Sequence, residues 1–274
     1  MADARAKRVL ETLIDNYSRT RPRIHTVVTN LGPAGAGDAV DLPTSAGGPI
    51  RDSATRLAPE LVGATVETMA IDNAVMVNRL LPQRDQIQLL EGSWLTAVAT
   101  QEQERMLNYI DDQMLANVIT IAEAGTVVNL DEGALAYSEL CDLEGEFEVT
   151  GTPREAMVYV AHPQAIGRLR TLDTNAFVPA FRGSESGMLG IPDVSTFNGI
   201  PVLTQASSAL LAGAGNDVPG IVLMNRRKTF FATQAAPAVR VVPDPESGGD
   251  ALQIRSVFGY HTIAGSARLA LAGA

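Results

Sequence analysis

The sequence predicts an α+β protein arranged around one very long helix. Three observations carry this prediction: an uninterrupted helical stretch from Ser93 to Gly125, a glycine- and alanine-rich segment from Leu31 to Arg56, and a C-terminal part dominated by strand patterns. At 1.5 Å per residue the helix would be roughly 45 Å long, about three times the usual length in globular proteins. We therefore expect it to lie across a large part of the molecule.

The composition indicates a globular protein and excludes several classes. Hydrophobic residues make up 46% of 274 residues, enough for a substantial core. The net charge of −10 argues against binding nucleic acid through its phosphates. A single cysteine, Cys141, excludes an internal disulfide. Because the sequence has no membrane-length apolar run and no signal-peptide pattern, we expect a soluble, unsecreted protein.

The long helix is amphipathic. Its apolar side chains recur in steps of three, four or eight: Leu95, Val98, Met106, Ile110, Met114, Val118 and Ile121. On the polar side, the acidic pair Asp111-Asp112 is interpreted as part of a solvated face. Gly125 is expected to end the helix in a left-handed conformation.

The N-terminal part precedes this helix. Ala2 to Arg19 has the spacing of a short amphipathic helix, and Ile24 to Val28 is predicted to be a brief strand. The segment from Leu31 to Arg56 has too few large apolar groups to fold alone. We expect an extended loop or hairpin that needs outside support, with Val40–Leu42 and Pro49–Arg51 as its two arms.

Mixed signals flank the long helix. Val62 to Leu81 predicts one or two strands, with a possible turn at Asp72-Asn73. A short helical segment is expected at Gln86 to Leu90. Beyond the long helix, short helices are expected at Asp131 to Leu140 and at Pro153 to Ala156.

The next part combines strands and a helix. Met157 to Ala161 has the pattern of a buried strand, and a helix is expected to open at His162-Pro163 and reach about Leu172. Asn198-Gly199 is a strong hairpin-turn signal before the strand Ile200 to Thr204. Another strand is predicted at Gly220 to Asn225.

The C-terminal part is predicted to be mainly strands. Phe230–Thr233 and Val239–Val242 are expected to flank a loop, and Ala251 to Phe258 to return as a strand. A final strand from His261 to Leu271 is expected to break at Gly265.

No metal or phosphate site emerges from the sequence. The histidines His25, His162 and His261 stand far apart without neighbouring ligands, so they are interpreted as structural or surface residues. Two glycine-rich segments, Gly32–Gly37 and Gly183–Gly187, lack the strand-before, helix-after setting of a phosphate-binding loop.

No catalytic site emerges either. Ser184 and Ser186 lack the spacing of a nucleophile elbow, and Cys141 has no base nearby in the sequence. The acidic residues Glu144, Glu146 and Glu148 alternate with other residues, which predicts one solvated face of a strand. The sequence therefore predicts no catalytic, cofactor-binding or metal-binding residues, and no cofactor.

The order of these parts is distinctive. Two segments stand out between the long helix and the C-terminal strands: MVYVAHPQAIGRL at Met157 to Leu169, and FNGIPVLT at Phe197 to Thr204. They are followed by IVLMNRRKTFF at Ile221 to Phe231. Together with the terminal helix, the unsupported loop and the long helix, they resemble the major capsid protein of tailed bacteriophages, with the Hong Kong 97-type shell fold.

The resemblance implies a division of the chain. It comprises an N-terminal arm at 1–31, an extended loop at 32–61, a peripheral domain at 62–130 and 221–256 with a spine helix at 93–125, and an axial domain at 131–220 and 257–274.

The resemblance also implies a function. It predicts a structural protein, not an enzyme, that self-assembles as pentamers and hexamers into an icosahedral shell in the virion. The shell would form in the host bacterial cytoplasm and enclose double-stranded DNA without binding it specifically or contacting a membrane. Because Met1 lies almost directly at the arm, we expect either a separate scaffold protein or assembly driven by the arm. The resemblance also implies a portal during assembly. Only two lysines occur, Lys7 and Lys228, so no covalent crosslink through the extended loop is expected.

Other functions stay open at this point. A bacterial encapsulin nanocompartment has a similar fold and would enclose protein. An enzyme would need a pocket of converging polar groups that forms only in three dimensions. A scaffold or adhesion module is a third possibility. Size-exclusion chromatography distinguishes them, because a shell elutes at megadalton mass.

Overall fold

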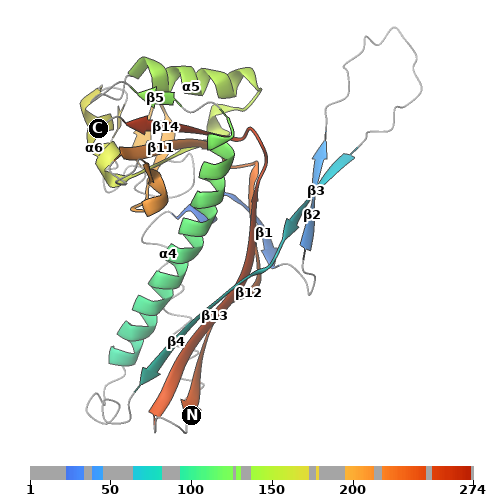
Figure 1. The fold of residues 1–274 in the computed structure, drawn as a ribbon, viewed down its shortest axis with the longest axis vertical. Helices are drawn as coiled ribbons and strands as arrows, with labels where there is room; N and C mark the ends of the chain where they lie inside the picture. The colour runs from blue at the N-terminus through green and yellow to red at the C-terminus, as the bar shows by residue number, and fades with distance from the viewer. Residues whose placement is uncertain are drawn as a thin grey trace.

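The computed structural model describes residues 23–33, 39–45, 64–81, 93–125, 128–130, 137–172, 177–178, 195–212, 218–244 and 249–272. The predicted helices at 2–19 and 86–90 lie outside these residues. Figure 1 shows a flat molecule crossed by one long helix, with a compact region at one end of that helix and long strands beside it. None of the described helices is long and apolar enough to cross a membrane.

The long helix is α4, from Ser93 to Glu123, which confirms the central prediction. Most of its predicted apolar stripe is buried, and Met106, Ile110, Met114 and Val118 are each at most 1% exposed. The expected left-handed stop at Gly125 is wrong, because Gly125 does not have a positive φ. Among the described glycines, positive φ occurs at Gly32, Gly151, Gly199 and Gly265.

The compact region contains an eight-stranded sheet in the order β5-β14-β11-β6-β9-β8-β7, with β10 paired to β11. Its strands are β5 (Val128–Leu130), β6 (Met157–Ala161), β7 (Phe177–Val178), β8 (Ser195–Phe197), β9 (Ile200–Thr204), β10 (Leu211–Ala212), β11 (Val218–Asn225) and β14 (Ala267–Ala272). The helices α5 (Tyr137–Val149) and α6 (Pro163–Leu172) and the short 3-10 helices η1 (Arg154–Ala156) and η2 (Ser208–Leu210) belong to the same region.

Several local predictions are confirmed in this sheet. β6 buries all five of its residues, and α6 begins at the predicted proline. Asn198 and Gly199 connect β8 to β9 with φ of 49° and 79°, the left-handed pair that a tight hairpin requires.

The strand predicted at Glu144, Glu146 and Glu148 is wrong. These residues lie in α5, not on a strand. The stronger pattern is helical, because the buried side chains Leu140, Leu143 and Phe147 follow one another in steps of three and four.

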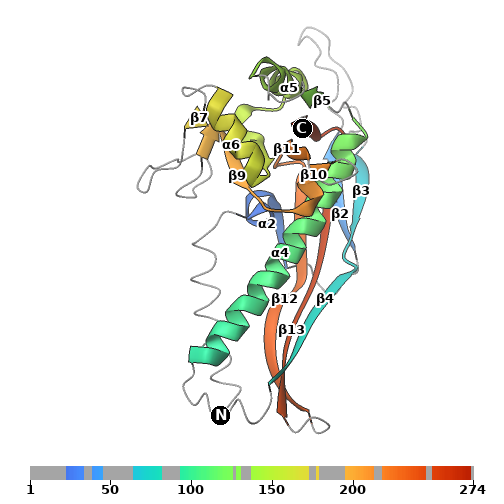
Figure 2. The ribbon, with the colours of Figure 1, turned by 60° about the vertical axis from the view of Figure 1, so that its left-hand side comes forward.

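A four-stranded sheet runs along α4 in the order β1-β12-β13-β4 (Figure 2). Its strands are β1 (Thr29–Pro33), β12 (Thr229–Asp244), β13 (Gly249–Thr262) and β4 (Asn73–Leu81). The loop expected between Phe230–Thr233 and Val239–Val242 is wrong, because β12 is continuous. The small residues there form bulges, with register shifts between Thr233 and Ala235 and between Ala235 and Ala238. The predicted break at Gly265 is confirmed, between β13 and β14.

A separate two-stranded sheet projects from this body. It consists of β2 (Ala39–Ser45) and β3 (Ala64–Ala70), which pair with each other (Figure 1). The expected arm at Val40–Leu42 therefore lies in β2, but its partner is β3. The other expected arm, Pro49–Arg51, lies outside the described residues. Ile71 and Asp72 lead from β3 into β4 of the other sheet and do not form a hairpin turn.

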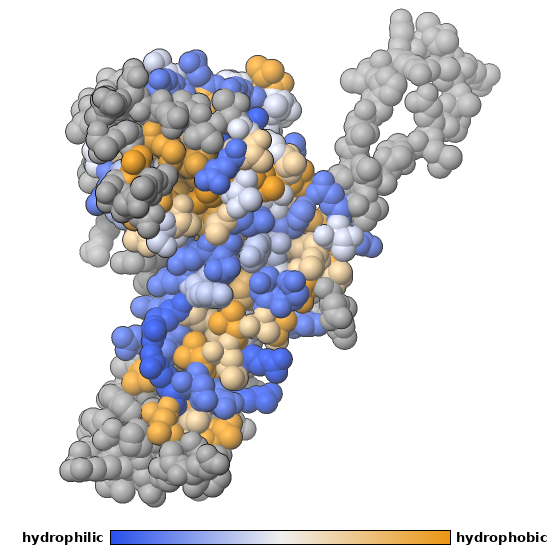
Figure 3. All heavy atoms as spheres, in the orientation of Figure 1, coloured by the Kyte–Doolittle hydropathy of each residue, from blue (hydrophilic) through white to orange (hydrophobic). Residues whose placement is uncertain are grey.

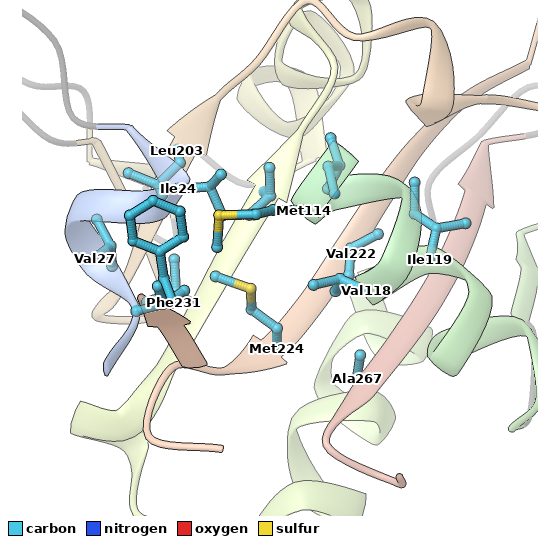
Figure 4. Close-up of a cluster of buried hydrophobic side chains, with 14 of the residues drawn as sticks. Ile24, Val27, Met114, Val118, Ile119, Leu203, Val222, Met224, Phe231 and Ala267 are labelled. Atoms are coloured by element: carbon cyan, nitrogen blue, oxygen red, sulfur yellow. The ribbon is translucent and has the colours of Figure 1, made fainter. Parts of the chain in front are cut away.

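The strand expected at Ile24–Val28 is also wrong, because Ile24–Val27 form the short helix α2. Thr26 stabilises the turn locally, since its Oγ1 accepts a bond from the Arg23 backbone N–H. The turn places Ile24 and Val27 in the core beside Met114 of α4 (Figure 4).

This shared core joins the two sheets. Val222 and Met224 of β11 and Phe231 of β12 meet α4 in it (Figure 4).

The arrangement of the sheets also bears on the predicted division of the chain into domains, which stays a prediction. β5 and β11 both belong to the eight-stranded sheet, on either side of β14, whereas the prediction grouped residues 62–130 and 221–256 with the long helix.

Candidate functional site

The β2–β3 hairpin is attached to the body only at its base, as far as its described residues show. Leu42, Met69 and Ile71 are at most 4% exposed and pack against Ala232 of β12. Further along, the hairpin has no third strand beside it among the described residues. Isolated two-stranded hairpins are at best marginally stable in water. The hairpin therefore gains its stability from a buried root.

Two further contacts fix the direction in which the hairpin leaves the body. β3 passes so close to β13 that a Cβ at Gly259 would lie 2.3 Å from the Ala70 carbonyl oxygen. Two residues along β13, His261 Nε2 lies 2.7 Å from a carboxylate oxygen of Glu67 on β3. His261 therefore braces the hairpin, a role that its sequence neighbours did not indicate.

The four-stranded sheet has one covered and one open face. Val75 and Val77 of β4 and Ile254 of β13 turn toward the core under α4. Alternate residues turn the other way, and Met76 and Leu80 are 60% and 49% exposed. We call the second side the open face. By strand register it contains Ala74, Met76, Asn78 and Leu80 of β4, Ala251, Gln253, Arg255 and Val257 of β13, and Ala235, Ala238, Arg240 and Val242 of β12. Of these, Ala251 is buried and Val257 packs against the hairpin root.

A buried carboxylate ties α2 to α4. Asp111, 2% exposed, accepts a bond from Arg23 Nη1 at 3.0 Å, and its other oxygen lies 2.6 Å from His25 Nδ1. The backbone N–H of His25 also donates to it, at 3.3 Å. The interpretation of Asp111-Asp112 as a solvated pair is therefore wrong for Asp111. Its partners come from a segment more than eighty residues away, which no local pattern reveals.

A second buried acid on α4 contacts the sheet edge. Glu102, 6% exposed, accepts a bond from Arg79 Nε of β4 at 2.8 Å and lies 3.3 Å from Arg105 Nη1. The ion pair with Arg79 holds the N-terminal half of the long helix against the edge strand.

Comparison with solved structures identifies this architecture. The structure matches the capsid of cyanophage P-SCSP1u with a TM-score of 0.62, at 14% identity, over 90% of this chain and 86% of that one. The capsid of Ralstonia phage GP4 gives 0.61 at 12%, over 94% and 90%. Mycobacterium phage Bobi gives 0.62 at 14%, over 93% and 92%. The chain has the Hong Kong 97-type capsid fold.

The Hong Kong 97-type fold confirms the α+β class and the order of parts predicted from the sequence. At 12–14% identity the likeness shows the fold alone. Neither protein-family models nor curated proteins give a match to the chain.

Within the compact region of this capsid fold, a third buried acid joins three elements. Glu144 of α5 is 1% exposed and accepts a bond from Tyr159 Oη of β6 at 2.8 Å. Asn198 Nδ2 of the β8–β9 turn donates to it at 3.3 Å, and Arg154 lies 3.4 Å away. Burial raises the pKa of Glu144, and the bonds from Tyr159 and Asn198 oppose that shift. Burial, and then Glu144, raise the pKa of Tyr159.

This cluster has the properties of a structural crosslink. Cys141 Sγ lies 3.5 Å from Asn198 Nδ2, an amide that cannot act as a base. The carboxylate of Glu144 faces hydrogen-bond donors of the protein itself. Among the described residues no group of three His, Cys, Asp or Glu is arranged to hold a metal ion. The glycine-rich segment at 183–187, Ser184 and Ser186 lie outside the described residues, as does most of 32–37.

Proposed function

We propose that the chain is a major capsid protein that assembles as pentamers and hexamers into an icosahedral shell around a phage genome. Its fold, shared with solved phage capsids over about nine tenths of the chain, supports this proposal. The role is structural and not enzymatic. The observation that carries the proposal is the β2–β3 hairpin, which projects from the body (Figure 1).

The physical argument concerns the stability of that hairpin. Its described side chains are buried on one face, at Leu42, Met69 and Ile71, whereas Asp41 and Thr68, which turn to the other face, are exposed. Lying across a neighbouring subunit would supply the apolar burial that the chain itself does not provide. Stability then comes partly from association, which favours complete assemblies over free monomers.

The remaining partners follow from a shell that must be filled and closed. We propose a separate scaffold protein and a portal during assembly in the host cytoplasm, and the virion as the final location. The net charge of −10 supports a wall that encloses DNA without binding it specifically.

The test is the mass and shape of the purified protein. We expect particles of megadalton mass in size-exclusion chromatography, with five-fold and six-fold clusters in electron micrographs. A matched variant replaces residues 46–63, which connect β2 and β3, by a two-residue Asn-Gly turn. This variant should keep the circular dichroism of the parent and stop at monomers or small rings.

Two results would contradict the proposal. One is an intact shell formed by the shortened variant. The other is a parent protein that stays a monodisperse low-order oligomer at every concentration and with co-expressed phage assembly proteins. Particles filled with protein and free of nucleic acid after expression with a packaging system would instead indicate a nanocompartment.

A further inference from the structure

We propose that the open face of the four-stranded sheet binds the outer face of α4 in a second copy of this chain. This inference rests on the proposed function, because it describes how neighbouring subunits of the shell meet. The two surfaces lie on opposite long sides of the flat molecule: α4 forms one side, and β4, β12 and β13 run along the other (Figure 1).

The open face is basic and partly apolar. Arg240 and Arg255 are exposed and, within the described part of the chain, have no ion-pair partner. Register places them diagonally on neighbouring strands, because Arg240 lies opposite Gln253 and Arg255 opposite Ala238. From the Ala74 row to the Leu80 row, the paired positions of this face hold no carboxylate.

The apolar part of the open face lies beside these arginines. Met76 is directly opposite Arg255, and Leu80 shares a row with Ala251 and Val242. Figure 3 shows hydrophobic residues among hydrophilic ones along the part of the molecule where α4 and the long strands run.

The outer face of α4 has the complementary charge. Among the acidic residues of α4, Glu102 and Asp111 are buried and have partners within the chain. Glu104 and Asp112 point away from the sheet, and the structure gives neither a basic partner within the described residues. Asn108 lies between them in the i, i+4 row and accepts a bond from Arg23 Nη1. Tyr109, 47% exposed, lies on an adjoining side of the helix and offers an apolar contact.

The spacing of the charges is compatible across the two faces. Glu104 and Asp112 are eight residues apart on a helix, which places their Cα atoms about 12 Å apart. The diagonal arginines are about 7–8 Å apart at the backbone, and their long side chains extend the reach further. Arg105 also lies on the helix face, but its charge is directed to Glu102.

A second copy fits this surface better than nucleic acid does. A chain with net charge −10 and only two unpaired arginines on this face offers little phosphate neutralisation. Complementary faces on opposite sides of one molecule form a head-to-tail contact, and repetition of such a contact closes a ring. The structure thus assigns to the open face the contact between neighbours within a ring.

Charge reversal tests the pairing. The double variant R240E/R255E makes both faces acidic, and the double variant E104R/D112R makes both basic. Each alone should raise the protein concentration needed for assembly by more than about tenfold, because like charges would meet. The quadruple variant, with both faces reversed, should assemble as the parent does.

Mixing the two double variants gives the sharper result. Acidic and basic copies can only alternate, so the mixture should recover six-membered rings but not five-membered rings. The control variant R227E/E155R exchanges the charges of an exposed ion pair remote from both faces and should behave as the parent. Thermal unfolding of each variant verifies that the monomer is intact.

The proposal is overturned if either double variant assembles as readily as the parent, or if the mixture associates no better than its components. Association of the mixed variants is measured by light scattering at low salt and should weaken in high salt. Light scattering of the mixture does not require a complete shell. If the parent protein forms no shell, the capsid function is contradicted, but the mixture still tests the contact between the open face and α4.

Discussion

The two sheets of the molecule differ in how completely the chain covers them. In the eight-stranded sheet, β6 is buried throughout and β11 is buried at every position but its first. In the four-stranded sheet, β4 has half-buried residues on one face, while Met76 and Leu80 on the other are 60% and 49% exposed. Among the described residues, the first region is therefore complete within one chain. The second has a face and a hairpin that the described residues of this chain cover only in part.

The largest effect is expected where the two regions are joined. Asp111→Ala removes the carboxylate that holds Arg23 and His25 against α4. It leaves a guanidinium at a site that is only 9% exposed, and breaking a buried pair in this way costs about 3–5 kcal/mol of unfolding free energy. Urea denaturation of the monomer measures the loss.

The neighbouring residue supplies the control for this change. Asp112 is half-exposed, and Asp112→Ala should change the unfolding free energy by less than about 0.5 kcal/mol. Equal effects of the two substitutions would show that the joint does not depend on the buried carboxylate.

A pair of apolar truncations compares the two sheets directly. Leu223 of β11 is 1% exposed, and Leu223→Ala should lower the unfolding free energy by about 2–5 kcal/mol. Met76→Ala, on the open face, should change it by less than about 0.5 kcal/mol but reduce the yield of assembled particles. Calorimetry of monomers and light scattering of assembly separate these effects. A large loss of monomer stability in Met76→Ala would remove the contrast between the sheets.

The root of the hairpin gives the next effect. In Gly259→Ala the new methyl group would lie 2.3 Å from the Ala70 carbonyl oxygen, so β3 has to move. We expect a loss of about 1–3 kcal/mol, typical of overpacking, together with lower particle yield. Gly145→Ala is the control, because its Cβ meets nothing within 4 Å and alanine favours a helix by up to about 1 kcal/mol. Normal assembly of Gly259→Ala would show that the hairpin tolerates other directions.

Local signals account for what the sequence predicted correctly. The long helix has an uninterrupted periodic stripe of apolar residues, and Asn198-Gly199 is a residue pair suited to a left-handed turn. Signals of this kind act over a few residues, so they remain readable without the fold.

The errors occur where distant partners decide the structure. The small residues between Phe230–Thr233 and Val239–Val242 look like a loop, but β13 supplies the hydrogen-bonding partner that keeps them in a strand. Asp111 stands in an acidic pair that is typical of a solvated helix face, but Arg23 and His25 bind it from another part of the chain. The open face was equally hidden, because only strand register brings Arg240 and Arg255 onto one side.

The smallest effect concerns Glu144, within the complete region. Burial is the largest influence on this group and raises its pKa above the ordinary value of 4.5. The folded state therefore holds a proton more tightly than the unfolded state does. The resulting stabilisation is fully present below the unfolded pKa and declines as the pH rises through the folded pKa.

Glu144→Gln should abolish this decline. The amide oxygen can still accept the Tyr159 hydroxyl bond, and no charge has to be kept away from water. Near pH 4 the variant and the parent should be about equally stable, whereas at pH 7 the variant should gain on the order of 1 kcal/mol. Urea denaturation of both proteins between pH 4 and 8 measures the difference. A difference that shrinks with rising pH would mean that the ionised carboxylate, held by Tyr159, Asn198 and Arg154, stabilises the compact region more than its burial destabilises it.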